Sequence, residues 1–151
     1  MFELIHSLAL DLAAARATAW AEIPADVPWL ADHFPGAPVL PGTLAAELCA
    51  QAAGPLAEET LRAREDLPRF AVLVRVKDLQ FLRPVELPAL VRIDADLLMV
   101  DGVRAAVAVV ARAADVVMLQ GKLHFAMVED APPAAVAARR ARLARWGAAG
   151  T

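Results

Sequence analysis

From Phe70 onward, hydrophobic and polar residues alternate with a period of two, which is typical of strands that bury one face. In LVRIDADLLMV (90–100), the apolar residues at 91, 93, 95, 97 and 99 alternate with Arg92, Asp94 and Asp96. Asp101-Gly102 follows at once and favours a tight hairpin turn. Further strands are predicted from 103 to about 111 and over VVMLQGKLHFAM (116–127). The pattern predicts an antiparallel sheet.

One strong internal helix is predicted over residues 43–62. This segment is rich in alanine and leucine and follows Pro41-Gly42, where a helix can start. Gly54-Pro55 could interrupt it. The residues that would form a buried stripe at helical spacing are Leu44, Leu48, Ala52 and Leu56. One helix packed on an antiparallel sheet makes the fold class α+β.

The remaining segments flank this helix and sheet. Residues 8–23 are interpreted as a first strand, and residues 24–42 as a long loop stiffened by five prolines. A loop of this length inside a compact domain is usually functional. We expect one domain over residues 1–130 and a C-terminal helical tail over 131–151, which begins with Pro132-Pro133. The tail's arginines favour a solvated helix face, with a docking surface for an acidic carrier protein as the alternative.

Composition narrows the class of protein. The chain has 151 residues, of which 59% are hydrophobic, so it can bury a core and is not expected to be disordered. The longest apolar run, 103–119, is broken by charges, and no membrane span is predicted. Charged residues also interrupt the first twenty positions, which we assign to the mature fold and not to a signal peptide. The single cysteine, Cys49, fits a reducing cytoplasm, and the net charge of −3 disfavours nucleic acid as a partner.

The stretch DHFPGAPVLPGTLAAELCAQAAG (32–54) carries the candidate chemistry. It places His33 in the proline-fixed loop, starts the helix at Gly42 and puts Glu47 about one and a half turns along it. The first amides of a helix have no internal partner and lie at the positive end of its dipole. A glycine there allows a ligand to approach the backbone closely. The set offers a base, an acid and an anion-stabilising amide without a metal or cofactor.

This set suits elimination of water from a 3-hydroxyacyl thioester. Imidazole is mostly neutral at pH 7, so His33 could remove the α-proton. The Gly42 amide could stabilise the negative charge that develops on the carbonyl oxygen. Glu47 could protonate the leaving hydroxyl if its apolar neighbours favour the protonated carboxyl.

The same stretch closely resembles the bacterial 3-hydroxyacyl-[acyl-carrier-protein] dehydratases. Their signature is a histidine in HFPGxPVxPG and an acidic residue fourteen positions later, and His33 and Glu47 keep this spacing. Downstream, the FLRPV segment (81–85) also resembles the family, and the resemblance covers roughly residues 20–128. It implies a hotdog fold, in which a curved antiparallel sheet wraps one long helix.

The resemblance also implies how the site is assembled. His33 and Glu47 of one site would come from different subunits of a homodimer, which could assemble further. Gly42, Phe34 and Gln51 would contact or orient the substrate, which would arrive on the phosphopantetheine arm of an acyl carrier protein. Glutamate at position 47 resembles the branch that only dehydrates and does not isomerise the double bond.

The chain departs from the family pattern beside the histidine. Asp32 replaces the usual glycine, and a carboxylate that faces His33 would favour the charged imidazole. Such differences suit a specialised relative that acts on polyene or polyketide intermediates.

Two other functions stay open: a hotdog acyl thioesterase, which would need an activated water, and a non-catalytic acyl-binding partner subunit. Gln51 is expected either to pack or to orient Glu47, and Cys49 to be a small buried side chain.

Overall fold

The computed structural model describes residues 3–148 as six strands and two α-helices with one 3₁₀ turn. In chain order the elements are β1 (Ile5–Asp11), β2 (Arg16–Ile23), η1 (Pro28–Leu30), α1 (Gly42–Glu65), β3 (Phe70–Phe81), β4 (Ala89–Val100), β5 (Arg104–Ala113), β6 (Val116–Val128) and α2 (Pro133–Arg145).

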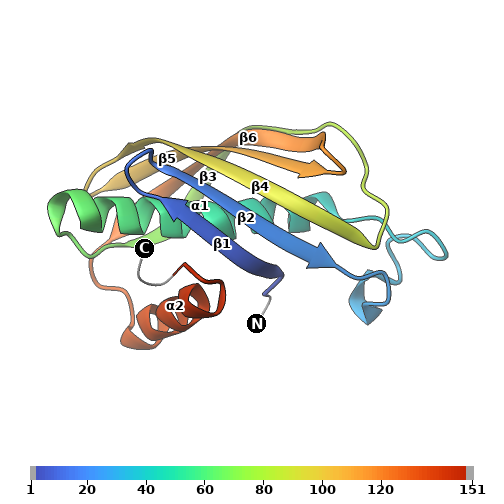
Figure 1. Cartoon of the computed structure of the whole chain (residues 1–151), viewed down its shortest axis with the longest axis horizontal. Helices are drawn as coiled ribbons and strands as arrows, with labels where there is room; N and C mark the ends of the chain where they lie inside the picture. The colour runs from blue at the N-terminus through green and yellow to red at the C-terminus, as the bar shows by residue number, and fades with distance from the viewer. Residues whose placement is uncertain (1–2, 149–151) are drawn as a thin grey trace.

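The strands form one antiparallel sheet in the order β1-β2-β4-β5-β6-β3. The sheet curves along α1, and α2 lies on the side of α1 away from the sheet (Figure 1). The α+β hotdog fold predicted from the sequence is confirmed, together with a short basic C-terminal helix.

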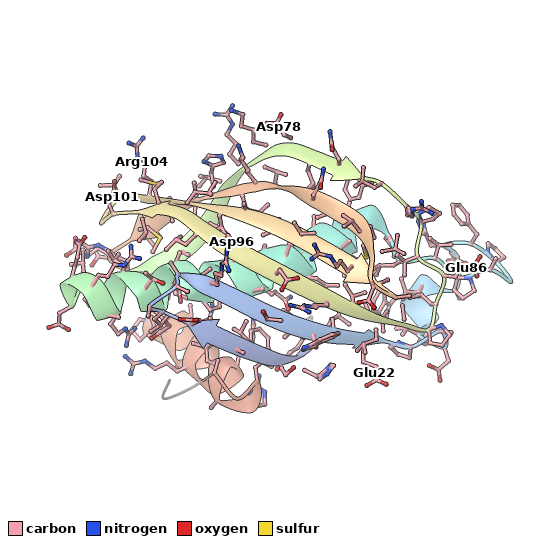
Figure 2. All side chains as sticks on the ribbon, turned by 45° about the horizontal axis from the view of Figure 1, so that its top comes forward. Glu22, Asp78, Glu86, Asp96, Asp101 and Arg104 are labelled. Carbon is pink, nitrogen blue, oxygen red and sulfur yellow. The ribbon has the colours of Figure 1, made fainter. Side chains whose placement is uncertain are left out.

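The period of two separates the core face of the sheet from its outer face. Val91, Ile93 and Ala95 of β4 are buried in the core. Between them, Asp94 accepts hydrogen bonds from Arg92 at 2.9 Å and from Arg112 at 2.8 Å on the outer face. Side chains such as Glu22, Asp96 and Asp101 likewise stand outside the layer that holds α1 (Figure 2). The sequence pattern therefore oriented β4 correctly.

The prediction of a single strand over residues 8–23 is wrong. The segment forms a hairpin, because β1 ends at Asp11 and β2 begins at Arg16. The Asp11 carboxylate accepts a hydrogen bond from the Ala14 amide at 2.9 Å, and Ala15 has a left-handed φ of 53°. The turn contains no glycine, asparagine or proline, so the usual signal was missing, and Asp11 was the one turn-forming side chain.

Gly54-Pro55 does not interrupt the helix, contrary to one reading of the sequence. Helix α1 runs for 24 residues through both positions, and every residue from Gln51 to Glu58 is buried. A helix packed on one face only would expose about half of its residues. Two turns of α1 are therefore enclosed by the sheet on one side and by α2 on the other.

Helix α2 is attached to the fold at its C-terminal end. Arg145 forms a two-pronged ion pair with Glu3, with N–O distances of 3.1 and 2.7 Å. The Leu8 amide donates to the Trp146 carbonyl at 2.9 Å, and the Leu143 and Trp146 side chains are buried in the core. The expected boundary at residue 130 falls between β6 and α2. Neither of the two α-helices within residues 3–148 has the length and apolarity needed to cross a membrane.

Candidate active site

The loop between β2 and α1, which includes His33, extends beyond the end of the sheet (Figure 1). The His33 amide donates to the Leu30 carbonyl at 3.0 Å, and the His33 carbonyl accepts from the Val39 amide at 2.8 Å. The rings of His33 and Phe34 stack with centroids 4.7 Å apart, and both side chains are exposed. The loop therefore holds the imidazole at the surface of the chain.

Gly42 is the first residue of α1, as expected. The amides of Leu44 and Ala45 donate to the Pro41 carbonyl at 3.0 Å, whereas the Gly42 amide has no hydrogen-bond partner in the described part of the chain. A Cβ atom at position 42 would lie 2.8 Å from the Phe81 ring, so the close approach of this ring favours glycine here. One residue thus meets a packing requirement and leaves an amide available to a ligand.

Glu47 and Gln51 lie one turn apart on α1 and form a pair. The Gln51 side-chain amide donates to the Glu47 carboxylate at 2.9 Å. Gln51 is only 8% exposed, whereas Glu47 is exposed in the single chain. Of the two expectations for Gln51, the contact supports an orienting role, since a buried amide fixes one carboxylate oxygen.

A cavity of about 170 Å³ opens beside this pair. Its other walls come from α1, β3, β6 and the C-terminal segment, and consist of Ala50, Gly54, Ala71, Leu73, Phe125, Arg139, Arg142 and Trp146. Sequence reasoning missed the contribution of α2, because the sequence pattern of a helix does not indicate what it packs against.

Within one chain the candidate residues form separate groups. No hydrogen bond or ion pair within residues 3–148 joins His33 to Glu47, and none joins His33 to the exposed Asp32. His33 contacts Phe34, Gly42 contacts Phe81, and Glu47 contacts Gln51. A single chain therefore presents three groups of candidate residues with no hydrogen bond or ion pair between the His33 and Glu47 groups among the described residues.

Glu58 and Arg139 form a buried ion pair that the sequence did not reveal. Glu58 is 4% exposed and accepts hydrogen bonds from Arg139 at 2.9 Å and from the Ala71 amide at 2.8 Å. Burial raises the pKa of Glu58 to about 7, although the Arg139 charge and the Ala71 hydrogen bond oppose the change. Burial also lowers the pKa of Arg139. The sequence feature that could have indicated this pair is a glutamate within the apolar part of α1, because a buried glutamate is almost always paired.

Two further observations limit the chemistry of the described residues. Cys49 is buried, and burial raises the pKa of its thiol to about 12, so it is a poor nucleophile at neutral pH. No group of three or more His, Cys, Asp or Glu side chains between residues 3 and 148 is arranged to hold a metal ion. The absence of a cofactor stays a prediction.

Comparison with known families decides the class of protein. Residues 11–98, more than half of the chain, match the family model of the ApeI-like proteins, described as ApeI dehydratase. The chain belongs to the ApeI-like dehydratase family. It is therefore an enzyme of the hydro-lyase class, and the suspected resemblance to dehydratases is confirmed.

Curated relatives agree with this assignment. The chain is 29% identical over 122 residues to the 3-hydroxyacyl-[acyl-carrier-protein] dehydratase FabZ of Chlamydia trachomatis, covering 81% of this chain and 79% of the relative. It is 37% identical over 71 residues to FabZ of Anaeromyxobacter, covering 46% of this chain and 45% of the relative.

Solved structures share the fold at low sequence identity. The smu.793 protein of Streptococcus mutans, solved bound to acetyl CoA, superposes with a TM-score of 0.65 at 12% identity, covering 87% of this chain and 94% of that one. AziG of S. sahachiroi gives a TM-score of 0.62 at 17% identity, covering 80% and 88%. A thioesterase of Haemophilus influenzae, HI1161, gives 0.58 at 14% identity, covering 76% and 72%. At such identities the likeness concerns the fold alone.

Proposed function

We propose that this dehydratase removes water from (3R)-hydroxyacyl thioesters on an acyl carrier protein and forms trans-2-enoyl thioesters. The proposal depends on the arrangement at the start of α1. Gln51 donates a hydrogen bond to Glu47, which lies about one and a half turns from Gly42, and the Gly42 amide has no hydrogen-bond partner among the described residues. The names of the FabZ relatives support the substrate class.

In this mechanism each group has one task. A neutral ring nitrogen of His33 takes the proton from C2, and the electron pair of that C–H bond enters the C2–C3 double bond. The Gly42 amide donates to the thioester oxygen while it carries negative charge, which contributes roughly 10²–10³ in rate at comparable sites. Glu47 gives its proton to the C3 hydroxyl, which leaves as water when the C3–O bond breaks. Proton transfer from His33 to Glu47 through solvent restores both groups.

The site requires a second subunit in this proposal. His33 projects on a loop beyond the sheet, whereas Glu47 lies on α1 beside the cavity formed with β3 and α2. Strand β3 is at the edge of the sheet and pairs with β6 alone. Its exposed apolar side chains, Val72, Val74 and Val76, are suited to contact with a second copy. In a homodimer, His33 of one subunit would reach Glu47 of the other.

A turnover assay of the purified protein with 3-hydroxyacyl thioesters tests the proposed function and the roles of His33 and Glu47. His33→Ala and Glu47→Gln should each lower kcat by about 10²-fold or more, with unchanged melting temperature and oligomeric state. Product analysis should detect enoyl thioester. His6→Ala, which alters an exposed histidine on β1, is the matched control and should keep full activity. Near wild-type turnover in either site variant would refute the role assigned to that residue.

The same assay separates the alternative chemistry. A thioesterase would release free thiol faster than it forms enoyl product, and free thiol is read independently with a thiol reagent. Absence of both products, together with binding of acyl thioesters, would support a non-catalytic partner subunit and contradict the dehydration proposal.

A further inference from the structure

Arg139 separates two cavities of the molecule. One is the cavity of about 170 Å³ beside Glu47 and Gln51. The other, also about 170 Å³, lies between the second half of α1, the start of β3 and α2, and is lined by Glu58, Phe70 and Leu143 among others. Among residues 3–148, Arg139 alone lines both cavities.

The Arg139 side chain is held in place from two sides. Its guanidinium donates to Glu58 at 2.9 Å, and its carbon centre lies 4.6 Å from the centroid of the Phe70 ring. Glu58 is itself fixed by the Ala71 amide at 2.8 Å. The Arg139 side chain is 17% exposed, and its charge is balanced by Glu58. It therefore acts as a fixed wall whose position depends on α1, α2 and β3 together.

The first cavity follows α1 from the proposed acid toward this wall. Glu47 and Gly54 both line it, and the seven helical steps between them span about 10 Å. A Cβ atom at Gly54 would lie 3.2 Å from Arg139 Nη1, so the wall stands directly against the helix backbone. The cavity lining is mixed: Ala71, Leu73 and Phe125 supply an apolar part, and this part suits a hydrocarbon chain. Polar side chains, among them Gln51 and Arg142, also line it.

We propose that Arg139 closes the far end of the acyl pocket and so determines the acyl chain length that the enzyme accepts. This inference rests on the proposed function, because it takes Glu47 as the end of the pocket where the chemistry occurs. The cavity on the Glu47 side of Arg139, about 170 Å³, is smaller than the roughly 300–1,000 Å³ that is usual for small-molecule sites. Short 3-hydroxyacyl chains fit in front of Arg139, whereas longer chains need the space that its guanidinium occupies.

Removal of the wall should join the two cavities. Arg139→Ala alone leaves the Glu58 charge buried without its partner, which destabilises the fold. The double variant Glu58→Gln/Arg139→Ala avoids this, and the side-chain carbonyl of the introduced glutamine can still accept from the Ala71 amide. We expect the ratio of kcat/KM for 3-hydroxydodecanoyl over 3-hydroxybutanoyl thioester to rise about tenfold or more, because methylenes placed in an apolar pocket carry energies of this size.

Two matched controls keep Arg139 in place. Arg140→Ala removes the same charge from the next position of α2, but Arg140 is exposed and lines only the second cavity, so the ratio should stay at the wild-type value. Glu58→Gln alone leaves the guanidinium in the structure and should change the ratio by less than the double variant does.

The opposite change comes from Gly54→Ala. The added methyl narrows the cavity beside Arg139, and alanine is the better residue for the interior of a helix, so the protein should stay folded. We expect the long-to-short ratio to fall. If the double variant fails to fold, Gly54→Ala tests the role of Arg139 by itself.

The outcomes separate this inference from the proposed function. If wild type dehydrates substrates and neither the double variant nor Gly54→Ala changes the ratio, the role of Arg139 is wrong while dehydration stands. If wild type forms no enoyl product, the proposed function fails. The role of Arg139 is then tested by calorimetry, which measures the affinity for acyl-CoA thioethers of increasing chain length. Equal affinities in wild type and both variants would contradict the proposed limit on chain length.

Discussion

At the scale of single residues, the contact between Gln51 and Glu47 leads to a prediction about positioning. Gln51→Leu keeps a side chain of similar size in the buried position but removes the donor to Glu47. We expect kcat to fall about tenfold with little change in KM or melting temperature, since a hydrogen bond contributes roughly 0.5–1.5 kcal/mol and this one positions the catalytic carboxyl. Steady-state kinetics and thermal unfolding measure both effects.

Gln120→Leu is the matched control for this prediction. It breaks a side-chain amide hydrogen bond to Gln80 at 3.1 Å, between exposed positions of β6 and β3, and leaves Glu47 untouched. A merely structural Gln51 would lower the melting temperature and leave kcat unaltered, and that result would reject the positioning role.

The motif predicted these residues better than the general pattern of the chain could. The structure places His33 in the loop before α1 and Glu47 on α1, the elements expected from the sequence, but Glu47 is exposed in the single chain although apolar surroundings were expected for it. The hydrogen bond from Gln51 to Glu47 follows from helix geometry, since residues four apart are neighbours. The packing of Phe81 against Gly42 could not be predicted, because that contact joins segments far apart in the chain.

At the scale of elements, the strands after Phe70 and the long helix could be predicted because each has one buried face with a regular period. The first hairpin could not, since its turn carries no glycine or proline. The docking of α2 could not either, because it depends on the Arg139–Glu58 and Arg145–Glu3 pairs, whose partners lie 81 and 142 positions away. A periodic pattern describes one element and does not specify its neighbour.

The Glu58–Arg139 pair between α1 and α2 makes stability depend on pH in an unusual direction. In the folded protein the pKa of Glu58 is raised from 4.5 to about 7, chiefly by burial. The folded state therefore holds this proton more tightly than the unfolded state does. Its contribution to stability is complete below about pH 4.5 and is lost as the pH rises through about 7. Most native carboxylates behave in the opposite way.

Denaturant unfolding of wild type and Glu58→Gln across this pH range tests the prediction. The difference between their free energies of unfolding, wild type minus variant, should fall by up to about 3 kcal/mol from pH 4.5 to 7. Glu59→Gln changes the neighbouring, less buried glutamate of α1 and should show no such fall. A difference that is constant with pH would mean that folding does not raise the pKa of Glu58, and would contradict the prediction.

At the scale of the whole molecule, the proposed site needs two chains, and each chain has an open sheet edge at β3. Strand β3 exposes apolar side chains, and Val74, at 63%, is among the most exposed. It sits in an irregularity of the β3–β6 pairing, between Leu73 and Arg75. A charge at this position should prevent association through β3. Val74→Arg is therefore expected to be monomeric and inactive, as measured by analytical ultracentrifugation and a turnover assay. The control Leu98→Arg alters an exposed leucine on β4 and should stay dimeric and active.

Mixing two inactive variants tests whether the subunits share the site. If His33 of one subunit serves Glu47 of the other, a heterodimer of His33→Ala and Glu47→Gln contains one site with both groups intact and one with neither. Random exchange in a two-fold dimer makes about half of the molecules heterodimers, so about a quarter of wild-type activity should return. If each chain carried a complete site, every site in the mixture would lack one group and no activity would return. The same mixture made in the Val74→Arg background should stay inactive, because recovery depends on the two chains meeting along β3.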